Sequence, residues 1–74
     1  MKNNFEEITK ELGCELAMYF YIPSGCYGRY QIIIRTPKGS TFEYTCDIDL
    51  SYEVADQESK MYNEFETQLK EWIA

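Results

Sequence analysis

Six acidic residues lie between positions 43 and 58, and no lysine or arginine interrupts them. They are Glu43, Asp47, Asp49, Glu53, Asp56 and Glu58. The chain has a net charge of −6, with 13 acidic and 7 basic residues, so the segments outside this run are neutral overall. A run of carboxylates can recognise a cationic surface by charge complementarity. These six residues therefore predict a protein partner with a basic surface, such as a nucleic-acid-binding enzyme.

A structural interpretation of the same acidic run stays open. Charges on an outer strand deter pairing between sheets, and acidic side chains are favourable at a helix N-terminus. Direct binding to nucleic acid is disfavoured, because phosphate contacts need a basic surface. Only Arg29 and Arg35 fall on the sheet that the sequence predicts.

Other reactive side chains give little sign of catalysis. The chain has no histidine, no nucleophile beside an obvious base and no glycine-rich loop of the kind that cradles phosphate, so we expect no enzyme activity and no cofactor. Cys14, Cys26 and Cys46 cannot all pair within one chain, and their wide spacing does not suit zinc. We expect free thiols, as in the cytoplasm, and no metal site.

Length and composition predict one small globular domain that covers residues 1–74. Apolar residues make up 45% of the chain and aromatic residues 16%, which favours a folded core over disorder. No apolar stretch approaches the ~20 residues that span a bilayer. The polar, acidic N-terminus does not resemble a signal peptide. We therefore expect a cytoplasmic protein (the host cytoplasm if a phage encodes it) that does not insert into membranes.

The first 13 residues predict a short helix. Asn4 and Glu7 have the spacing of a capping box, and Phe5, Ile8 and Leu12 recur at helical intervals. A glycine follows at position 13, where a helix commonly stops.

Three strands are predicted next, over residues 14–22, 29–36 and about 40–50, with turn residues 23–28 and 37–39 between them. In the first strand we expect the even-numbered residues 16–22 to face the core, and Tyr19 and Tyr21 to face away. In the second hairpin, Pro37-Lys38-Gly39 suits a three-residue loop with a bulge at the glycine. That loop predicts Ile34 opposite Phe42, because a slip of one residue would mix polar and apolar faces.

A long amphipathic helix is predicted from Val54 or Asp56 to Ile73. Its apolar stripe consists of Met61, Tyr62, Phe65, Leu69 and Trp72. The fold class is therefore α+β, with the order helix, three-stranded antiparallel meander, helix, and with both helices packed on one sheet face. This order resembles that of double-stranded RNA-binding domains. Those domains are basic at the start of the last helix, whereas here residues 51–56 read SYEVAD, so the resemblance implies the topology and not the function.

Tyrosine and arginine gather on the face of the sheet that the helices are expected to leave open. The predicted members of this surface are Tyr19, Tyr21, Tyr27, Arg29, Ile33 and Arg35. Exposed tyrosine beside arginine is typical of interface hot spots. Tyrosine is also simply a good strand former, so a half-solvated sheet face is the alternative.

Three functions follow for the chain, all without catalysis. The first is an acidic protein that blocks the basic surface of a partner; in size and charge the chain is similar to phage and mobile-element inhibitors of host defence, including anti-CRISPR proteins. The second is a small adaptor or homodimer that associates through the tyrosine-bearing face. The third is a small-molecule binder that uses Cys26 and Tyr27 at the loop.

Overall fold

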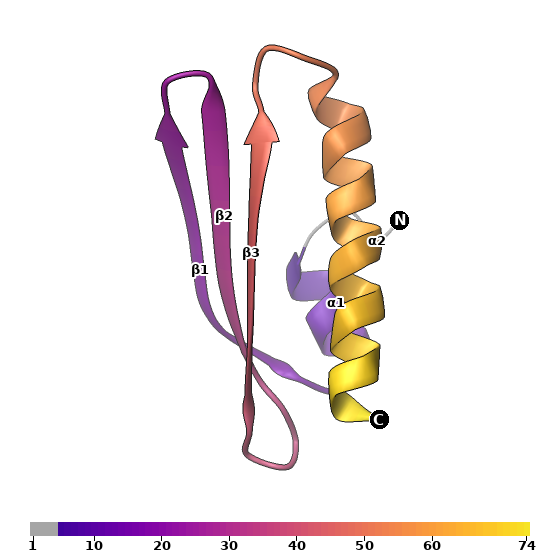
Figure 1. The fold of residues 1–74 in the computed structure, drawn as a ribbon. Coiled ribbons are helices and arrows are strands. Elements are labelled where there is room, and N and C mark those ends of the chain that lie inside the picture. Colours follow the sequence, from indigo (N-terminus) through magenta and orange to yellow (C-terminus); the bar gives the residue numbers. More distant parts are fainter. Residues whose placement is uncertain (1–4) are drawn as a thin grey trace.

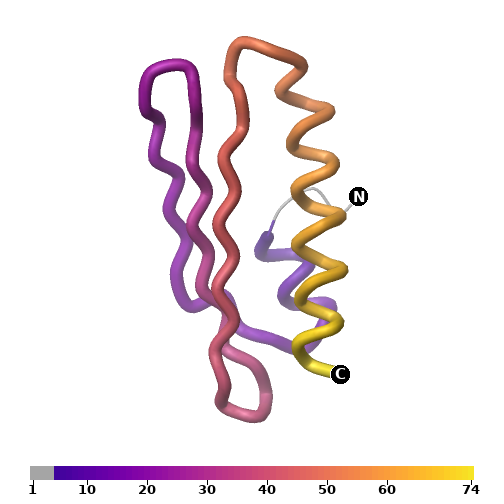
Figure 2. The backbone as a smooth tube through the Cα atoms, in the orientation of Figure 1, coloured from indigo at the N-terminus to yellow at the C-terminus, as the bar shows by residue number. Residues whose placement is uncertain are grey.

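The computed structural model describes residues 5–74, which form an α+β fold with the order helix, three strands, helix (Figure 1). The elements are α1 (Phe5–Glu11), β1 (Glu15–Ser24), β2 (Tyr27–Arg35), β3 (Thr41–Asp49) and α2 (Val54–Ile73). The strands form one antiparallel sheet in the order β1-β2-β3. The predicted fold class and meander are confirmed, and the trace in Figure 2 follows the two hairpins into the long C-terminal helix.

Helix α1 ends where the sequence predicts. Gly13 has a φ of +74°, which only glycine adopts at little cost, and its N–H donates to the carbonyl of Lys10 at 3.0 Å. The N–H of Cys14 donates to the carbonyl of Thr9 at 3.0 Å, so two carbonyls of the last turn are satisfied. The predicted N-cap, Asn4, lies outside the described residues.

The β1–β2 hairpin is tighter than the sequence suggested. Ser24 pairs with Tyr27, so the loop has only two residues, Gly25 and Cys26, in place of the six-residue turn expected over 23–28. Gly25 has a φ of +62° and Cys26 does not have a positive φ, which is the pattern of a type II′ turn.

The β2–β3 hairpin confirms the predicted register. Ile34 lies opposite Phe42, and Arg29 lies opposite Asp47. The N–H of Thr36 donates to the carbonyl of Ser40 at 2.9 Å, and Gly39 has the left-handed φ of +87° that the three-residue loop requires.

The face prediction for β1 is wrong beyond residue 16, because the strand contains a bulge. Leu16 pairs with Ile34 but Met18 pairs with Ile33, so Ala17 is the extra residue. Each later side chain is therefore on the opposite face from the one expected. Tyr19 and Tyr21 lie on the helix side, where their rings are 6.2 Å and 4.9 Å from the ring of Tyr30.

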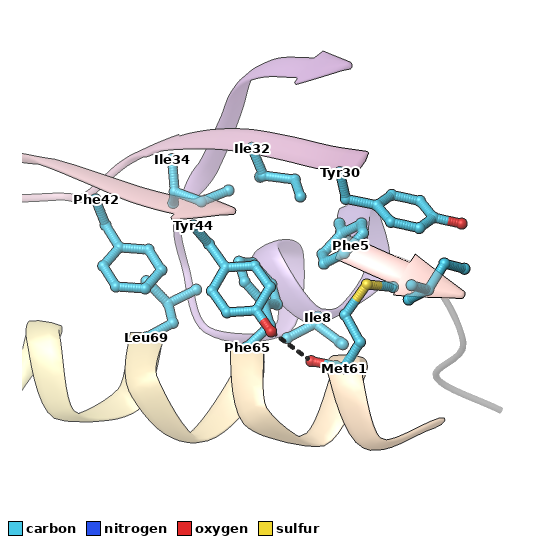
Figure 3. Close-up of a cluster of buried hydrophobic side chains, with 11 residues drawn as sticks. Phe5, Ile8, Tyr30, Ile32, Ile34, Phe42, Tyr44, Met61, Phe65 and Leu69 are labelled. Carbon is cyan, nitrogen blue, oxygen red and sulfur yellow. Dashed lines mark hydrogen bonds between the residues drawn. The ribbon is translucent and has the colours of Figure 1, made fainter. Parts of the chain in front are cut away.

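The core lies between the sheet and the two helices (Figure 3). Phe5 of α1 contacts both Tyr30 of β2 and Phe65 of α2, with ring centroids 5.6 Å and 4.9 Å away, so both helices cover the same sheet face as predicted. The fully or almost fully buried side chains at its centre are Phe5, Ile8, Ile32, Ile34, Ile48, Phe65 and Leu69. Trp72, expected in the core stripe, is 53% exposed, and its ring centroid lies 6.0 Å from that of Phe42.

Candidate protein-interaction surface

The face of the sheet opposite the helices is not covered by any element of residues 5–74, and we call it the open face. Strand pairing places side chains that lie directly opposite each other on the same face. Met18 pairs with Ile33, Phe20 with Gln31, and Ile22 with Arg29. The open face is therefore formed by Glu15, Met18, Phe20, Ile22, Ser24, Tyr27, Arg29, Gln31, Ile33, Arg35, Thr41, Glu43, Thr45, Asp47 and Asp49.

An apolar strip runs along β1 on this face. Met18, Phe20 and Ile22 are 46%, 48% and 45% exposed, although all three are large hydrophobic residues. Ile33 continues the strip onto β2, and Tyr27 extends it at the hairpin end. Single exposed hydrophobic side chains are common, but neighbours on one face form a patch that favours binding.

A shallow hollow of about 420 Å³ lies at the hairpin end of the open face. It is lined by Ile22, Ser24, Tyr27, Arg29, Gln31 and Asp47. Cys26 does not line it, so the structure does not bring together the cysteine and the tyrosine of the small-molecule hypothesis at this hollow. The hollow combines the apolar surfaces of Ile22 and Tyr27 with polar and charged side chains, a mixture that is typical of protein interfaces.

The cations of the open face are paired with acids. The Arg29 guanidinium donates to both carboxylate oxygens of Asp47, at 2.8 Å and 3.2 Å, and that hydrogen bonding holds the pKa of Asp47 below its ordinary value. Arg35 donates to Glu15 at 2.7 Å. Both pairs are exposed, so they add little stability, but they neutralise the two arginines of the open face.

The six acidic residues of the predicted run do not form one surface. Glu43 and Asp47 project from the open face, whereas the carboxylate of Glu58 lies on the helix side and accepts from the Tyr30 hydroxyl at 2.9 Å. Asp49 accepts from the N–H and the hydroxyl of Ser51, at 2.9 Å and 2.6 Å, which lowers its pKa. Glu53 lies at the start of α2.

Two tyrosine–carboxylate contacts join α2 to the sheet. Besides the bond between Tyr30 and Glu58, the Tyr44 hydroxyl lies 2.6 Å from a carboxylate oxygen of Glu64. The same hydroxyl lies 3.4 Å from the carbonyl of Met61, the contact drawn in Figure 3. Burial is the main cause that raises the pKa of both tyrosines, and the hydrogen bond to the carboxylate raises it further. Glu58, which the sequence suggested as a partner contact, is thus engaged in holding the helix.

The residues that sequence reasoning missed are Met18, Phe20 and Ile22. Every residue from Leu16 to Ile22 is apolar, so alternation gives no preference between the two faces of the strand. The two-residue turn at Gly25 and Cys26 would have revealed the register, because it forces Ile22 opposite Arg29, a residue already expected on the outer face. Of the predicted aromatic surface, Tyr27, Arg29, Ile33 and Arg35 do lie on the open face.

The cysteines do not gather into a reactive centre. Cys26 is exposed in the turn and its carbonyl accepts from the N–H of Leu50 at 2.7 Å, while burial raises the pKa of the half-buried Cys14 and Cys46 thiols. Within residues 5–74, no three metal-ligating side chains cluster, and neither helix is long and apolar enough to cross a membrane. Comparison with protein-family models, curated proteins and solved structures gives no match for the chain.

Proposed function

We propose that this chain is a non-enzymatic protein-interaction module that binds another protein through its open face. The observation that carries the proposal is the exposure of Met18, Phe20 and Ile22 on a sheet face that neither helix covers. Burying half-exposed side chains of this size against a partner is favourable by roughly 25 cal/mol per Å² of apolar surface.

The composition of the open face agrees with the anatomy of protein interfaces. Such interfaces have an apolar centre, a polar rim and aromatic and arginine anchors. Here the strip along β1 and Ile33 forms the centre, and the Arg29–Asp47 and Arg35–Glu15 pairs form the rim. Because all three cysteines are free, we place this function in a reducing compartment such as the cytoplasm.

The test is affinity capture from a cell extract followed by titration of the captured protein. Ile33→Arg and, separately, Tyr27→Arg place a charge on the open face, away from the β1 edge. We expect both to lose the partner that the wild type retains. Tyr52→Arg is the matched control, since Tyr52 is 65% exposed in the loop before α2 and lies outside the open face. Equal capture by all four proteins would reject the proposal.

A second candidate is the acidic inhibitor that occupies a basic, nucleic-acid-binding surface. It is favoured by Glu43, Glu53 and Asp56, which are exposed and, within residues 5–74, take part in no ion pair. Asp47 and Asp49 are engaged by Arg29 and Ser51 and are weaker contributors to such a contact.

Salt dependence tests this second candidate. Replacing Glu53 by Gln and Asp56 by Asn removes two charges and keeps the shape of both side chains. Because association driven by charge is screened by salt, the double variant should bind its partner more slowly and with a flatter salt dependence than the wild type. An unchanged salt slope would show that these carboxylates are only solvated.

A further inference from the structure

The two edges of the sheet differ in how well they are protected against pairing. Edge strand β3 carries the carboxylates of Glu43, Asp47 and Asp49, and α2 packs against it. Edge strand β1 carries no charge from Leu16 to Ser24. Of the described elements, none lies outside β1 (Figure 1). Charged residues and covering elements are the usual means of blocking an edge, so β1 is the unblocked edge of this sheet.

The hairpin turn determines which backbone groups of β1 point outward. In a two-residue hairpin the residues that flank the loop bond to each other, and inward and outward residues then alternate along the strand. Ser24 flanks the loop, so Ile22 and Phe20 also direct their N–H and C=O groups toward β2. Tyr19 and Tyr21 direct theirs to the free edge.

We propose that β1 pairs in antiparallel fashion with β1 of a second copy of this chain, around a two-fold axis at Phe20. In this register Tyr19 lies opposite Tyr21 of the second copy, so the outward N–H of each donates to the outward C=O of the other. Met18 then lies opposite Ile22 of the second copy, and the two Phe20 side chains face each other. Two three-stranded sheets become one sheet of six strands.

The residues at the two ends of the exposed β1 edge, Ala17 and Pro23, fit this register. Pro23 has no N–H to donate at the next outward position, and the bulge at Ala17 interrupts the strand at the other end. The register centred on Phe20 places Pro23 opposite Ala17, so neither residue is needed for a bond. A shift of the axis by one residue toward the loop would place Tyr19 opposite Pro23 and lose a bond.

The distribution of charge favours a second copy as the occupant. Two chains of net charge −6 repel each other, and the excess carboxylates lie on β3, on the loop after it and on α2. Pairing through β1 joins two strands that carry no charge from Leu16 to Ser24 and keeps the carboxylates of β3 at the far sides of the dimer. The cross-strand pairs, all between aromatic or aliphatic side chains, are of the kind that stabilises sheets.

This inference is independent of the proposed function. A dimer would align the two open faces on one side of a continuous sheet and present the apolar strip twice to a partner. A monomer could still bind a partner through Ile33 and Tyr27. Loss of the dimer and loss of partner binding are therefore separate results, measured on separate variants.

Sedimentation and hydrogen exchange of the full chain test the proposal. We expect a concentration-dependent dimer in which the amide hydrogens of Tyr19 and Tyr21 exchange slowly, and exchange faster on dilution. Phe20→Lys should weaken the dimer by about tenfold, because two like charges then face each other across the axis. Thr45→Lys adds the same charge on β3 and should leave the dimer unchanged. A strict monomer, or a dimer in which Tyr19 and Tyr21 exchange freely, would overturn the proposal.

A disulfide tests the register itself. Directly opposed residues that do not bond to each other have Cα atoms about 4.5 Å apart, which is within the range that a disulfide spans. In a Cys26→Ser background, Phe20→Cys should therefore cross-link the dimer on mild oxidation. Met18→Cys is the matched control and should not, because Met18 lies opposite Ile22 of the second copy and not opposite itself. Equal cross-linking by both variants, or by neither, would overturn the register. If neither variant cross-links and the β1 edge captures a different protein, the strand that pairs with β1 belongs to that protein and not to a second copy.

Discussion

The ring of Tyr21 lies across the backbone of Gly28, at the place where any other residue would carry its side chain. A Cβ atom built on Gly28 would be 2.5 Å from the Tyr21 hydroxyl oxygen and 2.6 Å from a ring carbon. Tyr21 is held there by Tyr30, whose ring centroid is 4.9 Å away. The absence of a side chain at Gly28 of β2 thus leaves the space that the Tyr21 ring of β1 occupies.

This relationship predicts that the effect of Gly28→Ala on stability reverses its sign once the ring of Tyr21 is removed. Gly28→Ala should destabilise the wild type by about 1 kcal/mol, because the displaced ring loses its contact with Tyr30. In a Tyr21→Ala background the same change should be neutral or stabilising, since alanine restricts the unfolded chain and suits a strand better than glycine. Chemical denaturation of the four proteins gives the coupling energy. A coupling energy near zero would mean that Tyr21 does not depend on this space.

The fold was predictable from the sequence where a single local pattern determined the geometry. Gly13 and Gly39 occupy left-handed positions that glycine adopts at little cost, and the Pro37-Lys38-Gly39 loop set the partner of Ile34. Helix α2 followed from a regular apolar stripe centred on Phe65. At each of these points a shift of one residue would have buried a charge or strained the backbone.

The candidate surface was not predictable in the same way, because β1 tolerates either orientation. Tyr19 and Phe20 are both large, aromatic and compatible with a core, so neither face of the strand is marked by charge. The two-residue turn at Gly25 and Cys26 decides between them, because it places Ile22 opposite Arg29, and the bulge at Ala17 then returns Leu16 to the core face; the alternation within β1 carries neither piece of information. Likewise, the role of Glu58 depends on Tyr30, which is 28 positions away in the chain.

Phe65 is the residue on which the docking of α2 most depends. It is fully buried, and its ring centroid lies 4.9 Å from that of Phe5 and 5.5 Å from that of Tyr44. Phe65→Ala should lower the free energy of unfolding by about 3–5 kcal/mol, because it leaves a cavity where both helices meet the sheet. Trp72→Ala, a control of similar size on the same helix, should cost clearly less, since that ring is half exposed. Similar losses for the two variants in thermal or chemical unfolding would contradict this view of the core.

Alkaline pH should unfold the protein through Tyr30 and Tyr44. Burial and the hydrogen bonds to Glu58 and Glu64 raise the pKa of both phenols above the ordinary value of 10.0, so the folded state favours their protonated forms. That stabilisation is complete below pH 10 and is lost progressively as the pH rises above it. We expect tyrosinate absorbance from these two residues to appear together with the loss of helical circular dichroism.

A conservative substitution separates this effect from general alkaline damage. Tyr30→Phe should cost about 1 kcal/mol at neutral pH, because the bond to Glu58 is lost, and it should make stability fall less steeply above pH 10. Tyr27→Phe removes an exposed phenol on the open face and should leave the alkaline curve as in the wild type. If Tyr30→Phe follows the wild-type curve throughout, the phenol of Tyr30 does not drive alkaline unfolding.

Glu53 occupies a left-handed backbone conformation that favours glycine. Its φ of 38° and ψ of 58° are left-handed, and its side chain forms no capping hydrogen bond to α2. The loop is held by the Gln57 side chain, which accepts from the N–H of Asp49 at 2.7 Å and donates to the carbonyls of Asp49 and Tyr52. The left-handed backbone of Glu53 is thus imposed by contacts that its own side chain does not make.

Replacing Glu53 by Gly should therefore stabilise the fold. The left-handed conformation costs a residue with a Cβ roughly 1–2 kcal/mol, and the added freedom of glycine in the unfolded chain offsets roughly 0.5–1 kcal/mol of the relief, so the net gain should be about 0.5–1 kcal/mol. Asp56→Gly is the matched control: it removes the same charge, but from a right-handed position in the first turn of α2, where glycine should cost about 0.5 kcal/mol. Denaturant midpoints that move in opposite directions for the two variants would support the strain at Glu53. If both variants shift the midpoint upward by the same amount, relief of charge repulsion, and not backbone strain, is the cause.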